Sequence, residues 1–238
     1  MYILLLILVI LRFVVYPLIG IVRQRKKSFD FITLTEREKS KLFNRGMSSI
    51  WSATLVLIIL SMLSNISLYN IGFRGINLNV SIWFMVIVLT LCGLLSIGLI
   101  CKTIVDLVHL KRNKEQKAEN RSTVILSLLP RSKKERIHYF FISLTAGICE
   151  EIIFRGLLFF LLQATFPNMA IPLVIAITSV VFGMGHIYQG FLGGAVRATI
   201  TGIIFGSLFW VTGSLFPVMF LHFIFDISDV FSLSGRTE

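Results

Sequence analysis

Long apolar stretches dominate this sequence and limit what the chain can fold into. Crossing the hydrocarbon core of a bilayer takes roughly 20 residues as a helix, and seven runs come close to that length. They lie at about 2–22, 50–70, 80–101, 138–164, 169–187, 191–211 and 214–233. Charged residues make up only 15% of the chain, which is too little for the surface of a soluble domain. We therefore predict an all-α, polytopic membrane helix bundle with seven transmembrane helices, or eight if a re-entrant segment is counted.

The distribution of basic residues predicts how the bundle is oriented. The loop near 23–49 holds eight Lys and Arg residues and the loop near 102–137 holds ten, whereas the loop between the second and third runs holds only Arg74. The positive-inside rule places the two basic loops in the cytoplasm and the N-terminus outside. The first run has no basic n-region and no cleavage site, so we expect a retained span. The predicted location is the cell membrane, as a multi-pass protein.

The formal net charge of +11 raises the question of nucleic acid as a partner. The basic residues lie in loops between apolar runs, with few aromatic side chains among them for base stacking. This pattern favours contact with anionic lipid headgroups. We expect membrane lipid and a peptide or protein substrate as partners, and no nucleic acid.

The three cysteines do not predict a disulfide framework. Cys92, Cys101 and Cys149 each lie in or beside an apolar run, and the sequence has no CxxC pair. The same spacing argues against a cysteine zinc site. Cys149 adjoins Glu150, so a cysteine nucleophile is one interpretation. The favoured interpretation is a small buried hydrophobic residue.

The fourth run carries three charged residues where lipid should exclude them. Glu150, Glu151 and Arg155 lie among apolar neighbours, and a charge at the bilayer centre costs at least about 2.5–3.5 kcal/mol. Glu151 and Arg155 are four residues apart and can pair on one helical face. Glu150 is rotated by roughly 100° and is left as a candidate general base. The alternative is that all three only hold helices together.

Two later runs add histidines at the same helical spacing. Phe182 and His186 share one face, and Gly183 beside them permits close helix approach. His222 and Asp226 share another face, where Asp226 can accept the second ring N–H of the histidine. Taken singly, His186 reads as an interfacial histidine and the His222–Asp226 pair as a structural hydrogen bond. Together, ionisable groups on three apolar helices indicate a bundle interior or a water-filled cavity.

The polar residues divide the chain into regions. Residues 1–137 are predicted as N-terminal transmembrane helices with the two basic cytoplasmic loops. Residues 138–233 form the expected catalytic transmembrane core, because the buried ionisable groups concentrate there. Residues 234–238 are a short C-terminal tail.

The three motifs together resemble the CPBP family. This family groups the type II CAAX prenyl endopeptidases with bacterial homologues, which include intramembrane proteases and bacteriocin-processing and immunity proteins. The resemblance covers roughly residues 138–230, and the first three spans match only in being hydrophobic. The matching residues are Glu150-Glu151-x-x-x-Arg155, Phe182-x-x-x-His186 and His222-x-x-x-Asp226.

The resemblance implies a role for each residue. Glu150 with His186 would position and deprotonate a water that attacks a peptide carbonyl. Glu151 and Arg155 would support Glu150. The residues alone lead to the same roles for the two glutamates, but they do not assign roles to the histidines.

The third motif departs from the family pattern. His222 and Asp226 would hold the developing oxyanion or orient the site, but the last position is often Asn in this family. An ionised Asp repels an oxyanion, so Asp226 would have to be protonated, orient His222 or help to hold a metal.

No cofactor is certain. Glu150, His186 and His222 are the candidate ligands of a catalytic zinc ion, and they also suffice for a metal-free glutamate–histidine water site. We favour the metal-free chemistry.

The sequence thus predicts an intramembrane endopeptidase that hydrolyses a peptide bond of a membrane-associated peptide or protein. One alternative is a non-catalytic membrane scaffold, such as a bacteriocin-immunity or regulatory protein of the same fold. A second is an ion or proton transporter, which buried Glu, His and Asp also permit. Transporters commonly contain inverted repeats, and no such repeat is visible here.

Overall fold

The computed structural model describes most of the chain. Its described residues are four single positions between 86 and 97 and the ranges 1–16, 18–19, 35–77, 130 and 132–234. Side chains are described as far as residue 228. The rest of the run predicted at 80–101 and the basic stretches 23–34 and 102–129 lie outside the described residues.

Every element of secondary structure in the described part of the chain is a helix, which confirms the predicted all-α class. Each of the other six predicted apolar runs overlaps described helices. In chain order the elements are α1 (Tyr2–Ile10), η1 (Leu11–Val15), α3 (Glu36–Leu63), α6 (Lys133–Glu151), η4 (Ile152–Leu158), α7 (Phe159–Thr165), α8 (Ile171–Gly185), η5 (Ile187–Gln189), η6 (Phe191–Val196), α9 (Arg197–Thr212) and α10 (Leu215–Ser234).

Two of these helices are long and apolar enough to cross a membrane. They are α3 and the continuous helix formed by η6 and α9. Shorter apolar helices cover Tyr2–Val15, Ile171–Gly185 and Leu215–Ser228. The described helices therefore agree with an apolar helical bundle.

Helix α3 differs from the predicted run at 50–70 at both of its ends. The Thr35 side chain accepts a hydrogen bond from the backbone N–H of Glu38, and the Glu38 carboxylate accepts one from the backbone N–H of Thr35. This capping box satisfies two N–H groups that the helix leaves unpaired, so the helix starts in the polar segment. It stops before Asn65, whose φ of 60° is left-handed and ends the helical path.

One residue counted among the cytoplasmic loop cations is buried instead. Lys39 is only 2% exposed, and its Nζ lies 3.4 Å from Oε2 of Glu135 on α6. Placing it in a basic loop was wrong, because the early start of α3 carries it into the helix. A buried ion pair whose partner is removed leaves an uncompensated charge, so this contact holds the starts of α3 and α6 together.

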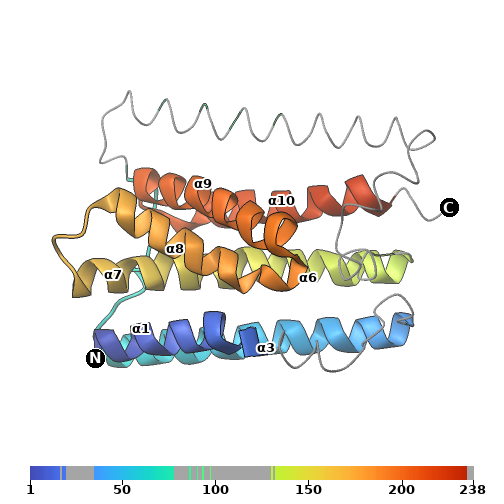
Figure 1. Cartoon of the computed structure of the whole chain (residues 1–238), viewed down its shortest axis with the longest axis horizontal. Coiled ribbons are helices and arrows are strands. Elements are labelled where there is room, and N and C mark those ends of the chain that lie inside the picture. Colours follow the sequence, from blue (N-terminus) through green and yellow to red (C-terminus); the bar gives the residue numbers. More distant parts are fainter. Residues whose placement is uncertain are drawn as a thin grey trace.

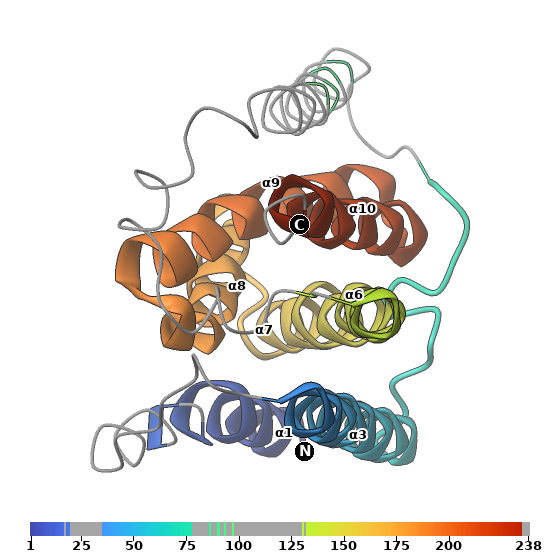
Figure 2. The same cartoon turned by 90° about the vertical axis from the view of Figure 1, so that its right-hand side faces the viewer.

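The helices lie in three layers (Figures 1 and 2). Helices α1 and α3 form one outer layer, and α9 and α10 form the opposite one. Between them lies the long rod of α6, η4 and α7, with α8 beside it. The rod is the centre of the fold, since all seven residues of η4 are buried.

Glycines bring α9 close to α8 and α6 close to α10. A Cβ atom at Gly202 of α9 would lie 2.9 Å from Cβ and 3.0 Å from Cα of Ser179 on α8. A Cβ atom at Gly147 of α6 would lie 3.1 Å from the carbonyl oxygen of Met219 on α10. Small residues at such crossings let helix backbones approach within membranes.

We predict opposite effects for two glycine-to-alanine changes. Gly202→Ala should destabilise the protein by about 1–3 kcal/mol, because overpacking pushes α9 away from α8. Gly46→Ala on α3 meets nothing within 4 Å and should stabilise the protein by up to about 1 kcal/mol through helix propensity. Thermal unfolding of the purified protein in detergent measures both. Equal changes of the same sign would contradict the packing of α8 on α9.

Candidate active site

A buried carboxylate joins three of the predicted site residues. Oε1 of Glu151 accepts a hydrogen bond of 2.8 Å from Nη1 of Arg155 and a second of 2.6 Å from Nδ1 of His222. The three residues are at most 5% exposed. Glu151 and Arg155 therefore pair along one helix as the sequence predicts, and Glu151 also holds the histidine of α10.

Arg155 extends this contact to two further helices. Its guanidinium carbon lies 4.4 Å from the centre of the Phe182 ring on α8 and 5.5 Å from that of Phe205 on α9. Its Nη2 donates to the carbonyl oxygen of Gly202 at 3.4 Å. A buried guanidinium needs partners for its charge and its donors. Here they are one carboxylate, one carbonyl and two aromatic faces.

Glu150 lies on the same helix but faces a different group of atoms. Its Oε2 is 3.8 Å from Nε2 of His186 and 3.9 Å from Nε2 of His222. Both separations exceed a direct hydrogen bond, and this oxygen is buried without a hydrogen-bond partner. A buried carboxylate oxygen without a partner is costly, so its surroundings suit a molecule that supplies a donor.

The two histidines present the same ring nitrogen to Glu150. Nδ1 of His186 lies 2.9 Å from the carbonyl oxygen of Phe182, and Nδ1 of His222 lies 2.6 Å from Glu151. Both of these partners are acceptors, so each Nδ1 carries the proton. Nε2 of each ring is then directed toward Glu150, which makes a small polar site bounded by three helices.

Asp226 lies beside His222, as their spacing of four residues predicts. Its Oδ1 lies 3.8 Å from Nε2 of His222, while Nδ1 of that ring is bound by Glu151. Glu151 thus holds Nδ1, and the 3.8 Å between Asp226 and Nε2 is longer than a hydrogen bond, so acceptance of the second ring N–H by Asp226 stays a prediction. The Asp226 side chain is 35% exposed and lies at the open side of the ring.

Comparison with known proteins gives one match. Residues 133–228 fit the family described as type II CAAX prenyl endopeptidase Rce1-like. This segment carries an Rce1-like domain. The match confirms the resemblance to the CPBP family, whose activity is that of a membrane-embedded protease. No curated protein and no solved structure matches the chain.

The Rce1-like domain holds all of the predicted site residues. They are Glu150, Glu151, Arg155, His186, His222 and Asp226, and the geometry above brings them together around one carboxylate pair. None of them comes from α1 or α3. The N-terminal helices instead pack against the central rod of the domain, where Phe13 of η1 contacts Phe154 of η4 with ring centres 5.6 Å apart.

The helix that carries both glutamates contains a feature with no clear sequence signal. Directly after Glu151 the α-helix widens into the π-helix η4, which includes Arg155. Short π-helical turns inside α-helices occur frequently at functional sites. The wider turn follows the two glutamates, so the residues beyond it face different neighbours than an unbroken α-helix would give them.

A tyrosine at the edge of the Rce1-like site was not predicted. The Tyr188 ring stacks on His186 with ring centres 6.3 Å apart and an interplanar angle of 26°. Nε2 of Gln189 donates to its hydroxyl at 2.8 Å, which leaves the O–H free to donate elsewhere. The side chain is 45% exposed. Its place two residues after His186 is the only sequence signal that could have found it.

The carboxylates and histidines do not form a ready metal site. In the part of the chain that the structure describes, no group of three or more His, Cys, Asp or Glu side chains is arranged to hold a metal ion. The candidate ligands Glu150, His186 and His222 have suitable chemistry for zinc, and a zinc site there stays a prediction.

We predict that the buried ion pair matters far more for stability than an exposed one. Arg155→Ala should cost about 3–5 kcal/mol, because Glu151 is left buried with an uncompensated charge. Lys134→Ala removes an exposed partner 3.8 Å from Glu36 and should cost no more than about 1 kcal/mol. Unfolding in detergent measures both variants. Similar losses would show that Arg155 does not neutralise Glu151.

Proposed function

We propose that this chain is an intramembrane endopeptidase that cleaves a peptide bond of a membrane-associated peptide or protein. The Rce1-like domain supports protease activity. The observation that carries the mechanism is the orphaned Oε2 of Glu150, which faces Nε2 of His186 and Nε2 of His222. A water that donates to this oxygen would also lie beside both rings.

In the proposed reaction, Glu150 acts as general base and then as general acid. The water oxygen bonds to the carbonyl carbon of the substrate while one water proton passes to Glu150, and His186 orients the water through Nε2. The carbonyl oxygen becomes an oxyanion. When the intermediate collapses, the C–N bond breaks and Glu150 returns the proton to the leaving nitrogen, which yields a new carboxyl terminus and a free amine.

His222 is the proposed donor to the oxyanion. Its Nδ1 already donates to Glu151, so donation from Nε2 requires the imidazolium form. The carboxylates of Glu151 and Asp226 flank the ring and compensate that charge, which gives Asp226 a role without direct contact with the oxyanion. The free O–H of Tyr188 offers a second donor at the edge of the site.

Glu151 and Arg155 are proposed as positioning residues. Glu151 fixes the tautomer and orientation of His222, in the way that a carboxylate orients a histidine in other enzymes. Arg155 pairs with Glu151 and keeps its carboxylate in place. This differs from direct support of Glu150, since the contacts of Glu151 are to Arg155 and His222.

The proposed setting is the cell membrane. We propose seven spans with the two basic loops in the cytoplasm and the N-terminus outside, which agrees with the apolar helices of the described part. The active site then lies within the bilayer, on helices α6, α8 and α10. The helices exclude bulk water, and this strengthens the electrostatic interactions inside the site.

Loss of the proposed base should abolish cleavage without loss of protein. Glu150→Gln and His186→Ala should each lower the cleavage rate of a membrane-associated reporter peptide by at least about 100-fold, as expected for general acid–base catalysis. Cys149→Ala is the matched control, because this buried neighbour takes no part in the mechanism. Unchanged cleavage in both site variants, at normal protein level, would contradict the proposed mechanism, and loss with Cys149→Ala would favour a cysteine nucleophile.

Activity should survive complete removal of metal. We propose metal-free chemistry, because Glu150 and the two histidines suffice to activate water. The purified active protein is treated with a chelator, its metal content is measured, and its cleavage rate should stay within about twofold of the untreated rate, whereas removing an essential catalytic ion would abolish it. Stoichiometric zinc whose removal stops cleavage and whose return restores it would contradict this mechanism.

A further inference from the structure

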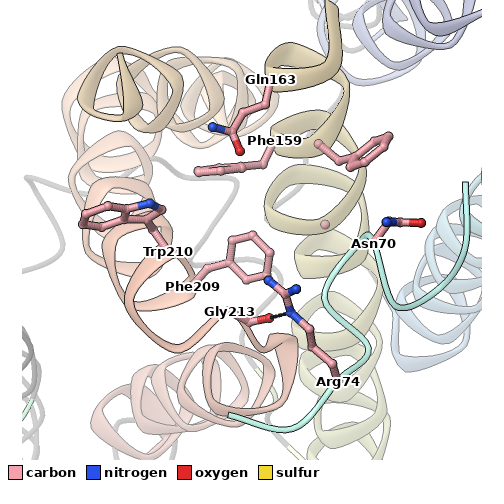
Figure 3. A pocket seen from close by; sticks show the side chains of 9 residues that line it. Asn70, Arg74, Phe159, Gln163, Phe209, Trp210 and Gly213 are labelled. Atoms are coloured by element: carbon pink, nitrogen blue, oxygen red, sulfur yellow. Dashed lines mark hydrogen bonds between the residues drawn. The ribbon is translucent and has the colours of Figure 1, made fainter. Parts of the chain in front are cut away.

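A pocket separate from the proposed catalytic site lies where α7, the turn after α9 and the segment 64–77 meet (Figure 3). It has a volume of about 250 Å³ and none of the six site residues lines it. Its walls include the aromatic rings of Phe159, Phe209 and Trp210, and Arg74 and Gln163 lie at its two ends. The lining therefore combines aromatic rings with polar groups, and Arg74 is its one charged side chain.

Arg74 is the residue that needs an explanation. It is the only basic residue between the second and third apolar runs, on the side of the membrane where the positive-inside rule disfavours Lys and Arg. Its Nε donates to the carbonyl oxygen of Gly213 at 2.7 Å, and its guanidinium lies 5.2 Å from the centre of the Tyr69 ring. Among the described residues no carboxylate pairs with it, so its positive charge is uncompensated at the pocket.

The pocket is held in place by backbone contacts rather than by a loose loop. The hydroxyl of Ser214 donates to the carbonyl oxygen of Arg74 at 2.7 Å, and the N–H of Leu215 donates to that of Gly72 at 3.0 Å. The N–H of Asn77 donates to the carbonyl oxygen of Thr212 at 2.9 Å. These bonds fix the segment that carries Arg74 against the turn between α9 and α10, so the guanidinium is preorganised.

Two uncharged polar side chains, Asn70 and Gln163, also line the pocket. Oδ1 of Asn70 is occupied, because it accepts from the N–H and the hydroxyl of Ser67 at 3.0 and 2.5 Å. The amide nitrogen of Asn70 is left to donate. No acidic side chain lines the pocket. A guanidinium beside aromatic walls matches an anion that carries an apolar chain.

We propose that this pocket binds an anionic phospholipid, with the headgroup phosphate on Arg74 and the start of an acyl chain along Phe159, Phe209 and Trp210. Phe166 and Phe216 each follow a pocket-lining residue by three positions in the sequence, and their rings are 47% and 56% exposed. Exposed aromatic surface of this kind suits lipid rather than water. The pocket is slightly smaller than the roughly 300–1,000 Å³ of small-molecule sites, so most of the lipid lies outside it.

Fluorescence of Trp210, which lines the pocket, can report lipid binding through quenching by brominated lipids. In a Trp51→Phe, Trp83→Phe background Trp210 is the only tryptophan, because the chain has three. The protein in a neutral detergent is titrated with brominated phosphatidylglycerol and, separately, with brominated phosphatidylcholine, and quenching of Trp210 is recorded. The anionic lipid should quench at about tenfold lower concentration, the effect of one charge-assisted contact. Arg74→Gln should remove this preference.

Arg12→Gln is the matched control, since Arg12 hydrogen-bonds to Ser49 on α3 and takes no part in the pocket. It should keep the preference for the anionic lipid. Equal quenching by the two lipids in the protein with Arg74, or an unchanged preference in Arg74→Gln, would overturn the proposal. Loss of the preference on adding an equal concentration of inorganic phosphate would also overturn it, because the pocket would then take a free anion. If Arg74→Gln does not accumulate, the comparison of the two lipids decides alone.

Discussion

The packing of α6, α8, α9 and α10 depends on one contact, in which Oε1 of Glu151 is shared by two donors. Arg155 and His222 both donate to this one oxygen, and Arg155 in turn contacts rings on α8 and α9. One carboxylate thus joins the central rod to three other helices. Removing a charge from water inside an apolar bundle is expensive, so the three groups stabilise each other only as a set. The bond from Nδ1 of His222 to Glu151 also fixes the tautomer of that ring and the direction in which its Nε2 points.

This arrangement separates two neighbouring carboxylates into different roles. Glu151 has two strong donors to one oxygen, and Glu150 has an oxygen with none. Adjacent positions on a helix point about 100° apart, which lets one side chain face the interior contacts and the other face the two histidines. Oε2 of each carboxylate is buried without a hydrogen-bond partner. The two residues differ because Glu151 is held by Arg155 and His222, which suits a positioning role, whereas Oε2 of Glu150 faces Nε2 of both histidines, which suits chemistry. The proposed mechanism follows from this difference and requires no other group to act as base.

The helices and the contacts within one helix could be predicted from the sequence, whereas contacts between helices could not. The i,i+4 spacing of Glu151 and Arg155 fixes a shared face, so their pairing was predicted and is confirmed. The apolar runs predicted helices, and the three motifs predicted the family of residues 133–228. The partner of Nδ1 in His222 was missed, because spacing within one helix says nothing about a carboxylate on another. The start of α3 and the burial of Lys39 were missed because hydropathy does not detect a capping box.

The π-helix η4 acts as a change of helical phase between two halves of one rod. Before it, Glu150 and Glu151 are directed at α8 and α10, and after it Phe159 is directed at Phe209 of α9 with ring centres 5.4 Å apart. Each residue advances an α-helix by about 100°, so losing a single residue from this turn would rotate everything beyond it by that angle. Phe159 and Gly156 would then leave the faces that they occupy. The length of this one turn therefore couples the orientation of the catalytic carboxylates to the shape of the aromatic pocket.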